Sequence, residues 1–460
     1  MKMMIRGARG SHHHRRGARW RLWLGGLALS VLSGCGGYDG NTASCDLVSR
    51  QTGLRAYFND WYFWYALSPY PEPGSLPTID AYFNALLYTG TDPNFPADRW
   101  SFHQSTESFN RFYGAGQLLG YGLFVADLEV AGAPTQPLFV RYVEPQSPAA
   151  AAGVTRGDQV VSIDGRPAAD MIAANDFSVL SPQAAGTSIQ IVLLNNAAQR
   201  TVNLTSAVFP LTPVPSSRVV TTSTGKKMGY LAIKDMLGQA GPPLAAAFQD
   251  LAAQGITELA IDLRYNAGGL LSVGRDLASY VNPSLTAART YASLLFNVKR
   301  APLNNSRFLF RSPANALSLT RVYVLQGART CAASEQVINA LRPFVTVVPI
   351  GDTSCGKPVG FVPLEGGCGE TYAVINFETM NASGEGRYFD GFAPSCAVAE
   401  DFTQPMGGDT DPLLVAARND ADGIACPVAT AAARERSLAA KVRRWAQGNP
   451  EGERGVMIPR

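Results

Sequence analysis

The stretch "RVYVLQGARTCAASEQVINAL", residues 321–341, decides the fold class that the sequence predicts. Its first part, "RVYVLQG", is apolar and β-branched, which favours a buried strand. A tight turn of small residues follows, and then an amphipathic helix. A turn of this kind, between a strand and a helix, is a place where an enzyme can carry a nucleophile, but Ala332 stands there and has no reactive atom.

The same alternation of strands and helices extends on both sides of this stretch. Strands are predicted for "MGYLAI" (228–233), "ELAIDLR" (258–264), "VTVVPIG" (345–351) and "TYAVINF" (371–377), and a helix for residues 242–255. We therefore expect residues 206–430 to form an α/β core, and residues 431–460 to form a charged C-terminal helix and tail. The whole chain of 460 residues is long enough for two or three domains.

The N-terminal segment reads as an export signal. Residues 1–21 carry seven basic and no acidic residues, and the apolar "LWLGGLALSVLSG" that follows ends at Cys35. The pattern "LSGC" resembles a bacterial lipobox, in which the cysteine becomes the lipidated first residue. We therefore expect residues 1–35 to be a signal peptide and the protein to be an exported, lipid-anchored protein of the bacterial cell envelope, facing the periplasm or the outside. An uncleaved anchor, or ordinary cleavage nearby, is the alternative.

Charge and composition narrow the class of protein further. The chain has 39 basic and 36 acidic residues, so removal of the seven leader cations turns a formal net charge of +3 into −4 (39 − 7 = 32 against 36). With no basic patch interleaved with aromatic residues, we expect no nucleic-acid partner. His103 is the one histidine outside residues 1–35, and its aromatic surroundings favour a structural role. A Ser-His-Asp triad therefore has one candidate base at most.

The cysteines suggest disulfide bonds rather than a metal site. Seven are present, and lipidation of Cys35 would leave an even number, which in an exported protein favours disulfides. No pair has CxxC spacing, so we expect no structural zinc site, and nothing else indicates a metal or an organic cofactor. The six remaining cysteines are Cys45, Cys331, Cys355, Cys368, Cys396 and Cys426.

The first half of the chain predicts two smaller regions. Residues 36–115 begin with a Gly, Ser and Asn-rich tether and continue with aromatic segments at helical intervals. Residues 116–205 are strand-rich and contain "SPAAAAGVTRGDQVVSIDGRP" (147–167), which resembles the PDZ domain. This resemblance implies that "GYGLF" binds a peptide, because glycines let successive backbone amides face one carboxylate. The implied peptide-binding residues are Gly120, Tyr121, Gly122, Leu123 and Phe124.

Four motifs of the α/β core together resemble one family. In order, they are "GYLAI", "IDLRYNAGG", "TCAASEQVINAL" and "GDTSCGKPVG" (351–360). With a PDZ-like region upstream, they resemble the S41 peptidases, the C-terminal processing or tail-specific proteases. The resemblance implies a multidomain α/β protein: an N-terminal helical cap, a β-rich PDZ domain and a protease core with the ClpP/crotonase-like fold of that family.

The resemblance also implies a catalytic site of the Ser-Lys type. Its nucleophile position falls on Ala332 and its general base on Lys357, 25 residues later. The implied oxyanion hole consists of the backbone amide of Ala333 and that of Gly268 or Gly269. Lysine serves as a base only when it is neutral, and the absence of an acidic neighbour in "CGKPVG" suits that requirement. The implied activity is endopeptidase cleavage of polypeptides.

Ala332 leaves three explanations open. The alanine is an engineered change that disables a serine protease, or a natural loss in a peptide-binding pseudo-protease, or another residue attacks. Ser334 lies on the far side of the helix, where a role in hydrogen bonding at the helix start is expected. Cys331 could attack only as a free thiol. If Lys357 lies close to position 332, however, Cys331 lies close to Cys355, and a disulfide between these two cysteines is expected. With that disulfide formed, the suggested remaining pairs are Cys368–Cys396 and, by elimination, Cys45–Cys426.

Overall fold

A computed structural model of the protein describes residues 44–426 and 456–459. Cys35 and the expected leader, together with most of the expected C-terminal helix and tail, lie outside these described residues. Within them, no helix is both long and apolar enough to cross a membrane. The described residues belong to one compact unit, which spans Thr42–Arg460.

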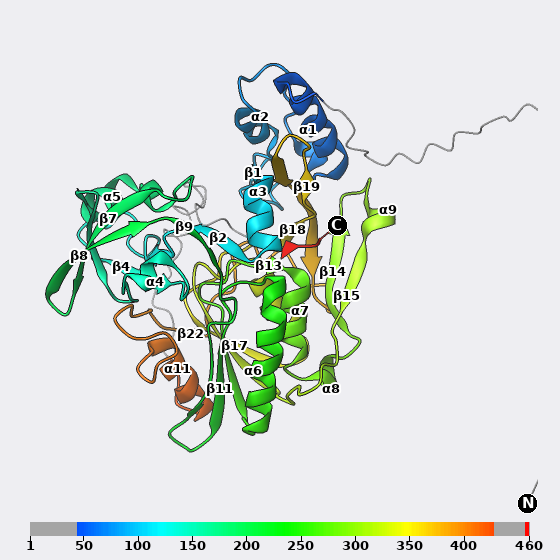
Figure 1. Ribbon diagram of the computed structural model, residues 1–460. Helices are drawn as coiled ribbons and strands as arrows, with labels where there is room; N and C mark the ends of the chain where they lie inside the picture. The colour runs from blue at the N-terminus through cyan, green and yellow to red at the C-terminus, as the bar shows by residue number, and fades with distance from the viewer. Residues whose placement is uncertain (1–43, 427–455, 460) are drawn as a thin grey trace, which may run out of the picture. The chain divides into compact units, whose positions relative to one another are not determined.

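The centre of the molecule is a six-stranded sheet with helices on both faces (Figure 1). Its strands, in spatial order, are β10 (Ser216–Thr221), β11 (Lys227–Ala232), β12 (Glu258–Asp262), β16 (Arg321–Gln326), β17 (Thr346–Gly351) and β22 (Cys396–Ala397). All pairings are parallel except that of the edge strand β10. The predicted α/β class is confirmed, because parallel strands need helical crossovers.

Apolar residues explain which helix covers which face of this sheet. Helices α6 (Gly241–Ala253), α7 (Leu271–Ser279) and α10 (Ala333–Leu341) share one buried cluster with Leu231, Ile261 and Val324. Alternate strand residues point the other way and pack against α11 (Pro412–Ala421). The sheet is thus buried on both faces, and α10 lies directly after its central strand β16.

A second six-stranded sheet lies beside the first and carries the strand that follows Lys357. Its order is β13 (Gly269–Leu270), β23 (Val456–Met457), β18 (Val359–Phe361), β21 (Ile375–Met380), β14 (Thr290–Phe296) and β15 (Ser306–Leu309). The short helices α8 (Pro283–Thr286) and α9 (Ala301–Asn304) adjoin β14 in the chain. Residues 456–457, expected to belong to a tail, instead form the strand between β13 and β18.

The N-terminal helices pack their aromatic residues against the core. Helix α1 (Leu47–Trp61), the turn η1 (Tyr65–Leu67) and α2 (Ile79–Leu86) share a buried cluster with Tyr372 and Ile375. The next strand, β1 (Phe102–Ser105), pairs with β20 (Glu370–Ala373), which also pairs with β19 (Leu364–Glu365). This region therefore shares its hydrophobic core with distant parts of the sequence.

A separate small sheet forms the PDZ-like region. Its strands are β3 (Leu123–Val125), β4 (Leu138–Val143), β5 (Gln159–Ile163), β7 (Ser188–Asn195) and β8 (Ala198–Thr205), with β6 (Arg166–Pro167) paired to β5. They enclose an apolar cluster of their own with α4 (Pro148–Ala151) and α5 (Ala168–Ala174). The chain enters and leaves through the antiparallel pair β2 (Gln117–Gly120) and β9 (Ala207–Pro210). The preceding α3 (Thr106–Phe109) and η2 (Asn110–Gly114) lead into β2.

The disulfides agree with the sequence at one pair and differ at the other two. Cys331 is joined to Cys355, as expected, whereas Cys45 is joined to Cys368 and Cys396 to Cys426. The suggested pairs Cys368–Cys396 and Cys45–Cys426 are therefore wrong. The physical reason is that Cys45 lies just before α1, which packs beside β19 and β20, whereas Cys426 follows α11, which covers the sheet next to β22.

Candidate active site

Position 332 lies at a strained turn between strand β16 and helix α10. Ala332 has φ 53° and ψ −111°, a conformation that a residue with a side chain rarely adopts. It is completely buried, and the helix begins at the next residue. Backbone strain of this kind persists only where the surroundings enforce it, and it is common at strand-to-helix turns that carry nucleophiles.

Hydrogen bonds from the segment after β12 hold this turn in place. The backbone carbonyl of Asn266 accepts from the amide of Cys331 at 3.1 Å and from Oγ of Ser334 at 3.0 Å. Oγ of Thr330 donates to the carbonyl of Leu263 at 2.8 Å. Ser334 is thus engaged with the "NAGG" turn, and the expectation that it would hydrogen-bond at the start of its own helix is wrong.

Glu335 is the residue that joins position 332 to position 357. Its Oε2 accepts from the backbone amide of Ala332 at 3.0 Å and from that of Lys357 at 2.8 Å. Its Oε1 accepts from Oγ of Ser354 at 2.6 Å and from the amide of Gly356 at 2.7 Å. Burial raises the pKa of this carboxyl group, although all four hydrogen bonds favour its charged form.

The sequence analysis assigned no role to Glu335. The available signal was a glutamate three residues after the first residue of the turn, the spacing of a capping box. In a capping box the first residue and the glutamate each accept a hydrogen bond from the other's backbone amide. Ala332 has no side-chain acceptor, but Glu335 accepts from the backbone amide of Ala332. The contacts of Glu335 with residues 354–357 could not be predicted from the neighbouring sequence, because those residues belong to a loop about 20 positions further along the chain.

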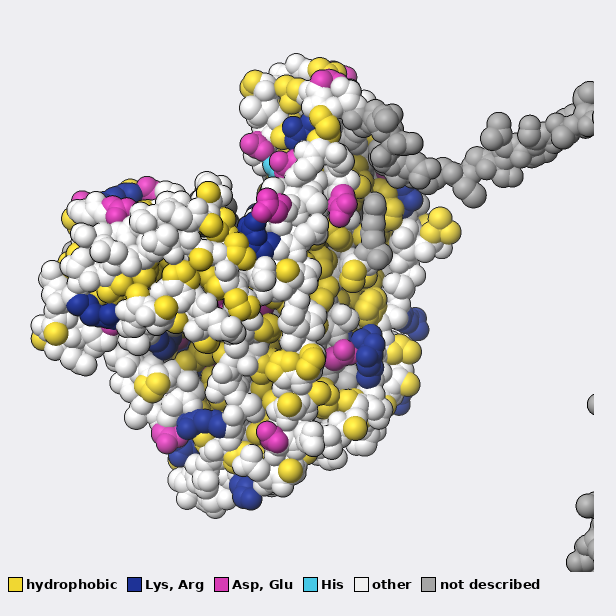
Figure 2. Space-filling model, in the orientation of Figure 1, with side chains coloured by type: hydrophobic (Ala, Val, Ile, Leu, Met, Phe, Trp, Pro, Cys, Tyr) yellow, Lys and Arg dark blue, Asp and Glu magenta, His cyan; other side chains and the backbone are white. Residues whose placement is uncertain are grey.

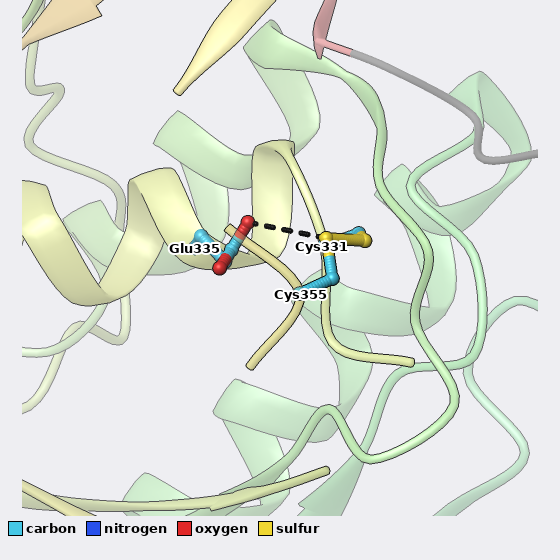
Figure 3. Close-up of side chains that lie close together, drawn as sticks. All are labelled: Cys331, Glu335 and Cys355. Atoms are coloured by element: carbon cyan, nitrogen blue, oxygen red, sulfur yellow. Dashed lines mark hydrogen bonds between the residues drawn. A yellow bond between two sulfur atoms is a disulfide. The ribbon is translucent and has the colours of Figure 1, made fainter. Parts of the chain in front are cut away.

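The Cys331–Cys355 disulfide lies against the same carboxylate (Figure 3). Sγ of Cys355 is 3.5 Å from Oε2 of Glu335, and all three side chains are buried. Two thiolates and a carboxylate would suit a soft metal ion, but sulfurs bonded to each other are not thiolates. The disulfide instead ties the residue before position 332 to the loop that carries Lys357.

Lys357 is fully buried in the loop between β17 and β18. The preceding Gly356 has φ 85°, and a Cβ there would lie 2.1 Å from the carbonyl oxygen of Phe389. Only glycine fits this approach, so the "GK" pair fixes how the chain delivers the lysine. A fully buried lysine is rare.

The "NAGG" turn lies beside position 332, where the oxyanion hole is expected. The amide of Gly268 donates to Oδ1 of Asn266 at 3.0 Å, so it is already engaged. Gly269 has φ 131°, and a Cβ there would lie 2.3 Å from the carbonyl oxygen of Met236. Of the two glycines, Gly269 is therefore the better candidate donor, together with the buried Ala333 at the start of α10.

A buried charged cluster supports the start of the "NAGG" turn and was not predicted. Arg264 donates to Asp411 at 2.6 Å, to Asp262 at 3.0 Å and to Glu400 at 3.3 Å. Arg156 of the PDZ-like region donates to the same Glu400 at 2.8 Å. Desolvation raises the pKa of the buried Asp262 carboxyl group. The cluster therefore links the PDZ-like region to the segment that holds Ala332.

The residues of "GYGLF" line a cavity of about 630 Å³. Gly122 has φ 80°, and a Cβ there would lie 2.0 Å from Cβ of Ser147, so the loop needs a glycine. Strand β3 is the edge of its sheet, which leaves its outer backbone groups open to a further strand. Figure 2 shows the hollow beside this region, with basic and acidic side chains over the adjoining α3 region.

His103 does not contribute to this site. Its Nδ1 is 3.2 Å from Glu370 and its Nε2 is 3.1 Å from Asp80, and its ring packs on Phe83 with centroids 4.8 Å apart. These contacts join β1 to α2 and to β20, which is the structural role that its aromatic surroundings suggested.

Comparison with known proteins identifies both regions. Residues 227–398 match peptidase family S41, and residues 139–194 match the PDZ domain. The chain is 27% identical over 391 residues to a carboxyl-terminal-processing protease of a Synechocystis strain, covering 78% of this chain and 83% of that protein. A second such protease, from a Picosynechococcus strain, is 26% identical over 239 residues, covering 51% of this chain and 55% of that protein.

A solved structure supports the fold. A Bacteroides fragilis protein assigned to the S41 proteases superimposes with a TM-score of 0.63 at 24% identity, covering 81% of this chain and 97% of that one. The molecule thus combines an α/β core of peptidase type with a PDZ domain. Residues 227–398 are thus the part of the chain that is similar to peptidase family S41, and residues 139–194 are the part that is similar to the PDZ domain.

Proposed function

We propose that this chain has the architecture of a serine endopeptidase of the Ser-Lys type, which acts on polypeptides in the cell envelope. The observation that carries the proposal is that one oxygen, Oε2 of Glu335, accepts from the backbone amides of both Ala332 and Lys357. A single buried carboxylate therefore fixes the positions of the proposed nucleophile and the proposed base. The strained φ of Ala332 supports the same assignment.

With serine at position 332, Lys357 acts as the base and the amides of Ala333 and Gly269 stabilise the developing negative charge. The neutral amine of Lys357 takes the proton from the serine Oγ, which attacks the carbonyl carbon of the scissile peptide bond. Negative charge develops on the carbonyl oxygen, toward the amides of Ala333 and Gly269. The ammonium of Lys357 then passes this proton to the leaving nitrogen as the C–N bond breaks, which leaves an ester of the serine. In the second half of the reaction water gives a proton to Lys357 and attacks this ester, and the serine Oγ leaves with that proton.

With alanine at position 332, acyl transfer has no nucleophile, so the chain as it stands is inactive or nearly so. Neither of the two nearest residues with a hydroxyl or thiol after position 330, Cys331 and Ser334, replaces the missing oxygen. Cys331 is disulfide-bonded, and Ser334 donates to the carbonyl of Asn266. The alternative function, a peptide-binding protein without catalysis, is favoured by Ala332 itself. In both cases the PDZ domain binds a polypeptide segment through residues 120–124.

The proposed location follows from the sequence. The basic leader and the lipobox-like pattern that ends at Cys35 support export and lipid anchoring. Three disulfides among the described residues agree with an oxidising compartment. Labelling with a radioactive fatty acid, compared between the parent and its Cys35→Ser variant, tests the anchor directly.

A protein-substrate assay tests the catalytic proposal. The parent, its Ala332→Ser variant and the double variant Ala332→Ser, Lys357→Met are incubated with unfolded casein. Cleavage by the Ala332→Ser variant alone supports the proposed dyad. Cleavage by neither single nor double variant, with both folded as judged by circular dichroism, favours the non-catalytic alternative.

A further inference from the structure

The hairpin of β14 and β15 carries the two most exposed large apolar side chains among the described residues. Val298 and Leu303, in the turn and in α9 between the two strands, are 75% and 86% exposed. Leu309 on the edge strand β15 and Leu285 on the preceding α8 are exposed as well. Half of the exposed large apolar side chains in the described ranges thus lie within residues 285–309. Such a concentration is typical of an interaction surface.

Contacts with α1 hold the exposed turn in place. Nδ2 of Asn297 donates to the carbonyl of Asp60 at 3.0 Å. Oδ1 of Asn297 accepts from the amides of Lys299 and Arg300 at 2.9 and 3.1 Å. Arg300 is also paired with the carboxylate of Asp60. Val298 stands between these fixed residues, so its exposure follows from the geometry of the turn and leaves it available to a partner outside the chain.

The same part of the chain is basic. Residues 277–320 contain five basic residues and no acidic one, although residues 36–460 as a whole have 32 basic residues against 36 acidic ones. Arg289, Lys299 and Arg307 of this stretch are exposed. Arg307 and Leu309 are two positions apart on β15, so their side chains lie on the same face of the strand. The hairpin therefore presents apolar and cationic groups together.

An anionic lipid surface fits this combination better than a second copy of the chain does. In a symmetric dimer through the hairpin, the basic residues of the two copies would face one another and repel. Residues 427–455 of the same chain are a poor complement too, since they contain six basic and three acidic residues. Anionic headgroups attract lysine and arginine, and the boundary between headgroups and acyl chains accepts apolar side chains.

The position of the hairpin agrees with a membrane nearby. Ten residues separate the proposed lipidation site Cys35 from Cys45, and a chain of that length spans at most about 35 Å. Helix α1 follows Cys45, has 15 residues and is about 22 Å long. The hairpin turn contacts the last residues of α1, and Figure 1 shows α9 at the margin of the molecule. A bilayer that holds a lipid on Cys35 is therefore within reach of this turn.

We propose that the β14–β15 hairpin, together with α8 and α9, is a membrane-contact face that binds a bilayer containing anionic phospholipids. Val298 and Leu303 enter the boundary between headgroups and acyl chains. Arg289, Lys299 and Arg307 attract the phosphates. A lipid at Cys35 would attach the protein to the membrane, whereas this face would fix its orientation on the surface.

Sedimentation with vesicles tests this proposal. The protein used begins at residue 36, so that neither the leader nor a lipid contributes, and it retains the whole compact unit Thr42–Arg460. One set of vesicles is pure phosphatidylcholine, and the other contains roughly one third phosphatidylglycerol, which is anionic. We expect at least about tenfold tighter binding to the anionic vesicles at low salt. This preference should shrink at high salt, because the charges are screened.

Substitutions on the hairpin separate its apolar and cationic parts. The double variant Val298→Ser, Leu303→Ser should bind the anionic vesicles about tenfold more weakly, since both apolar side chains are lost from the interface. Arg307→Gln should weaken that binding about fivefold and leave binding to phosphatidylcholine unchanged. A matched control is the double variant Val48→Ser, Ile424→Ser, because both side chains are 50% exposed and lie outside the hairpin. It should bind as the unsubstituted protein does.

Three results would overturn the proposal. The first is equal binding to both kinds of vesicle, and the second is equal weakening by the hairpin and the control substitutions, with all variants folded as judged by circular dichroism. The third is a dimer, seen by analytical ultracentrifugation without lipid, that the Val298→Ser, Leu303→Ser variant cannot form. That result would show that the face joins two copies of the chain. None of these results bears on cleavage by Ala332→Ser.

Discussion

Oε2 of Glu335 is 2.8 Å from the backbone nitrogen of Lys357 and accepts its hydrogen bond. The same oxygen accepts from Ala332, so the two proposed catalytic positions share one anchor that is not itself part of the bond-breaking chemistry. Glu335 is in this sense a positioning residue.

The Ala332→Ser variant should gain proteolytic activity. We expect its rate on an unfolded protein substrate to exceed that of the parent by at least about a thousandfold, because the parent has no nucleophile. Initial rates of peptide release measure the gain. Adding Ser334→Ala should leave most of the activity, since Oγ of Ser334 contacts the Asn266 carbonyl and not the substrate. Loss of all activity on that second change would contradict the assignment of position 332.

Replacing Glu335 by glutamine should remove a pH dependence of stability. Burial raises the pKa of this carboxyl group above its value in the unfolded chain, so the folded state binds the proton more tightly. Its contribution to the free energy of unfolding is therefore fully present below the unfolded pKa and is lost as the pH rises through the folded one. Relative to Glu335→Gln, the parent should lose stability as the pH rises above about 4.3.

Urea unfolding of both proteins between pH 4 and pH 8 checks this prediction. Glu365 offers a matched control because its side chain is exposed. Its substitution by glutamine should not change how the free energy of unfolding varies with pH. A parent that becomes more stable relative to Glu335→Gln as the pH rises would show that the four hydrogen bonds outweigh burial at this carboxylate.

Peptide mapping without reduction should find three linked pairs: Cys331 with Cys355, Cys45 with Cys368, and Cys396 with Cys426. Replacing both Cys331 and Cys355 by alanine should lower the free energy of unfolding by about 3 kcal/mol, the value expected from the entropy of a loop of this length. In the Ala332→Ser background, activity should fall as well, because the loop of Lys357 loses its covalent tie to position 331. Recovery of a Cys45–Cys426 peptide would refute the described pairing.

Arg156 should prove necessary for the attachment of the PDZ domain to the core. Its guanidinium donates to Glu400, to the hydroxyl of Tyr265 and to the carbonyl of Gln404, and only 13% of the side chain is exposed. Arg156→Ala leaves these acceptors with fewer donors, which we expect to cost about 2–4 kcal/mol of stability. Thermal unfolding measures the loss.

A second arginine of the PDZ domain provides the comparison. Arg166 pairs with Asp176 near the surface, where both side chains are more than a third exposed. Its change to alanine should alter stability by less than about 0.5 kcal/mol. Equal effects at both positions would mean that the charged cluster does not join the domain to the core.

The sequence predicted the parts of the molecule that have a local signal. Strand β16 and helix α10 were predictable from apolar periodicity, and the place of Lys357 in a Gly-Lys pair was implied by the resemblance to the S41 peptidases. The role of Glu335 was not, because its partners at residues 354–357 come close only in the folded chain.

The disulfides show the same limit of prediction from the sequence. The Cys331–Cys355 pair was predicted because a functional argument brought its two segments together. For the other four cysteines only separations along the chain were available, and those say nothing about which loops meet. Cys45 and Cys368 are 323 residues apart and still adjoin, because the aromatic face of α1 packs on the β19–β20 region.

Strand β23 has a practical consequence for anyone who produces this protein. Val456 pairs with Gly269 on one side and with Gly360 on the other, so β23 is inserted between the segment of the proposed oxyanion hole and the strand that follows Lys357. A purification handle fused close behind this strand, or a shortened expression version ending before residue 456, would disturb both segments at once. An inactive preparation made in that way would say nothing about the hydroxyl that Ala332 lacks, and affinity tags are better attached near the other terminus, after the proposed lipidation site at Cys35.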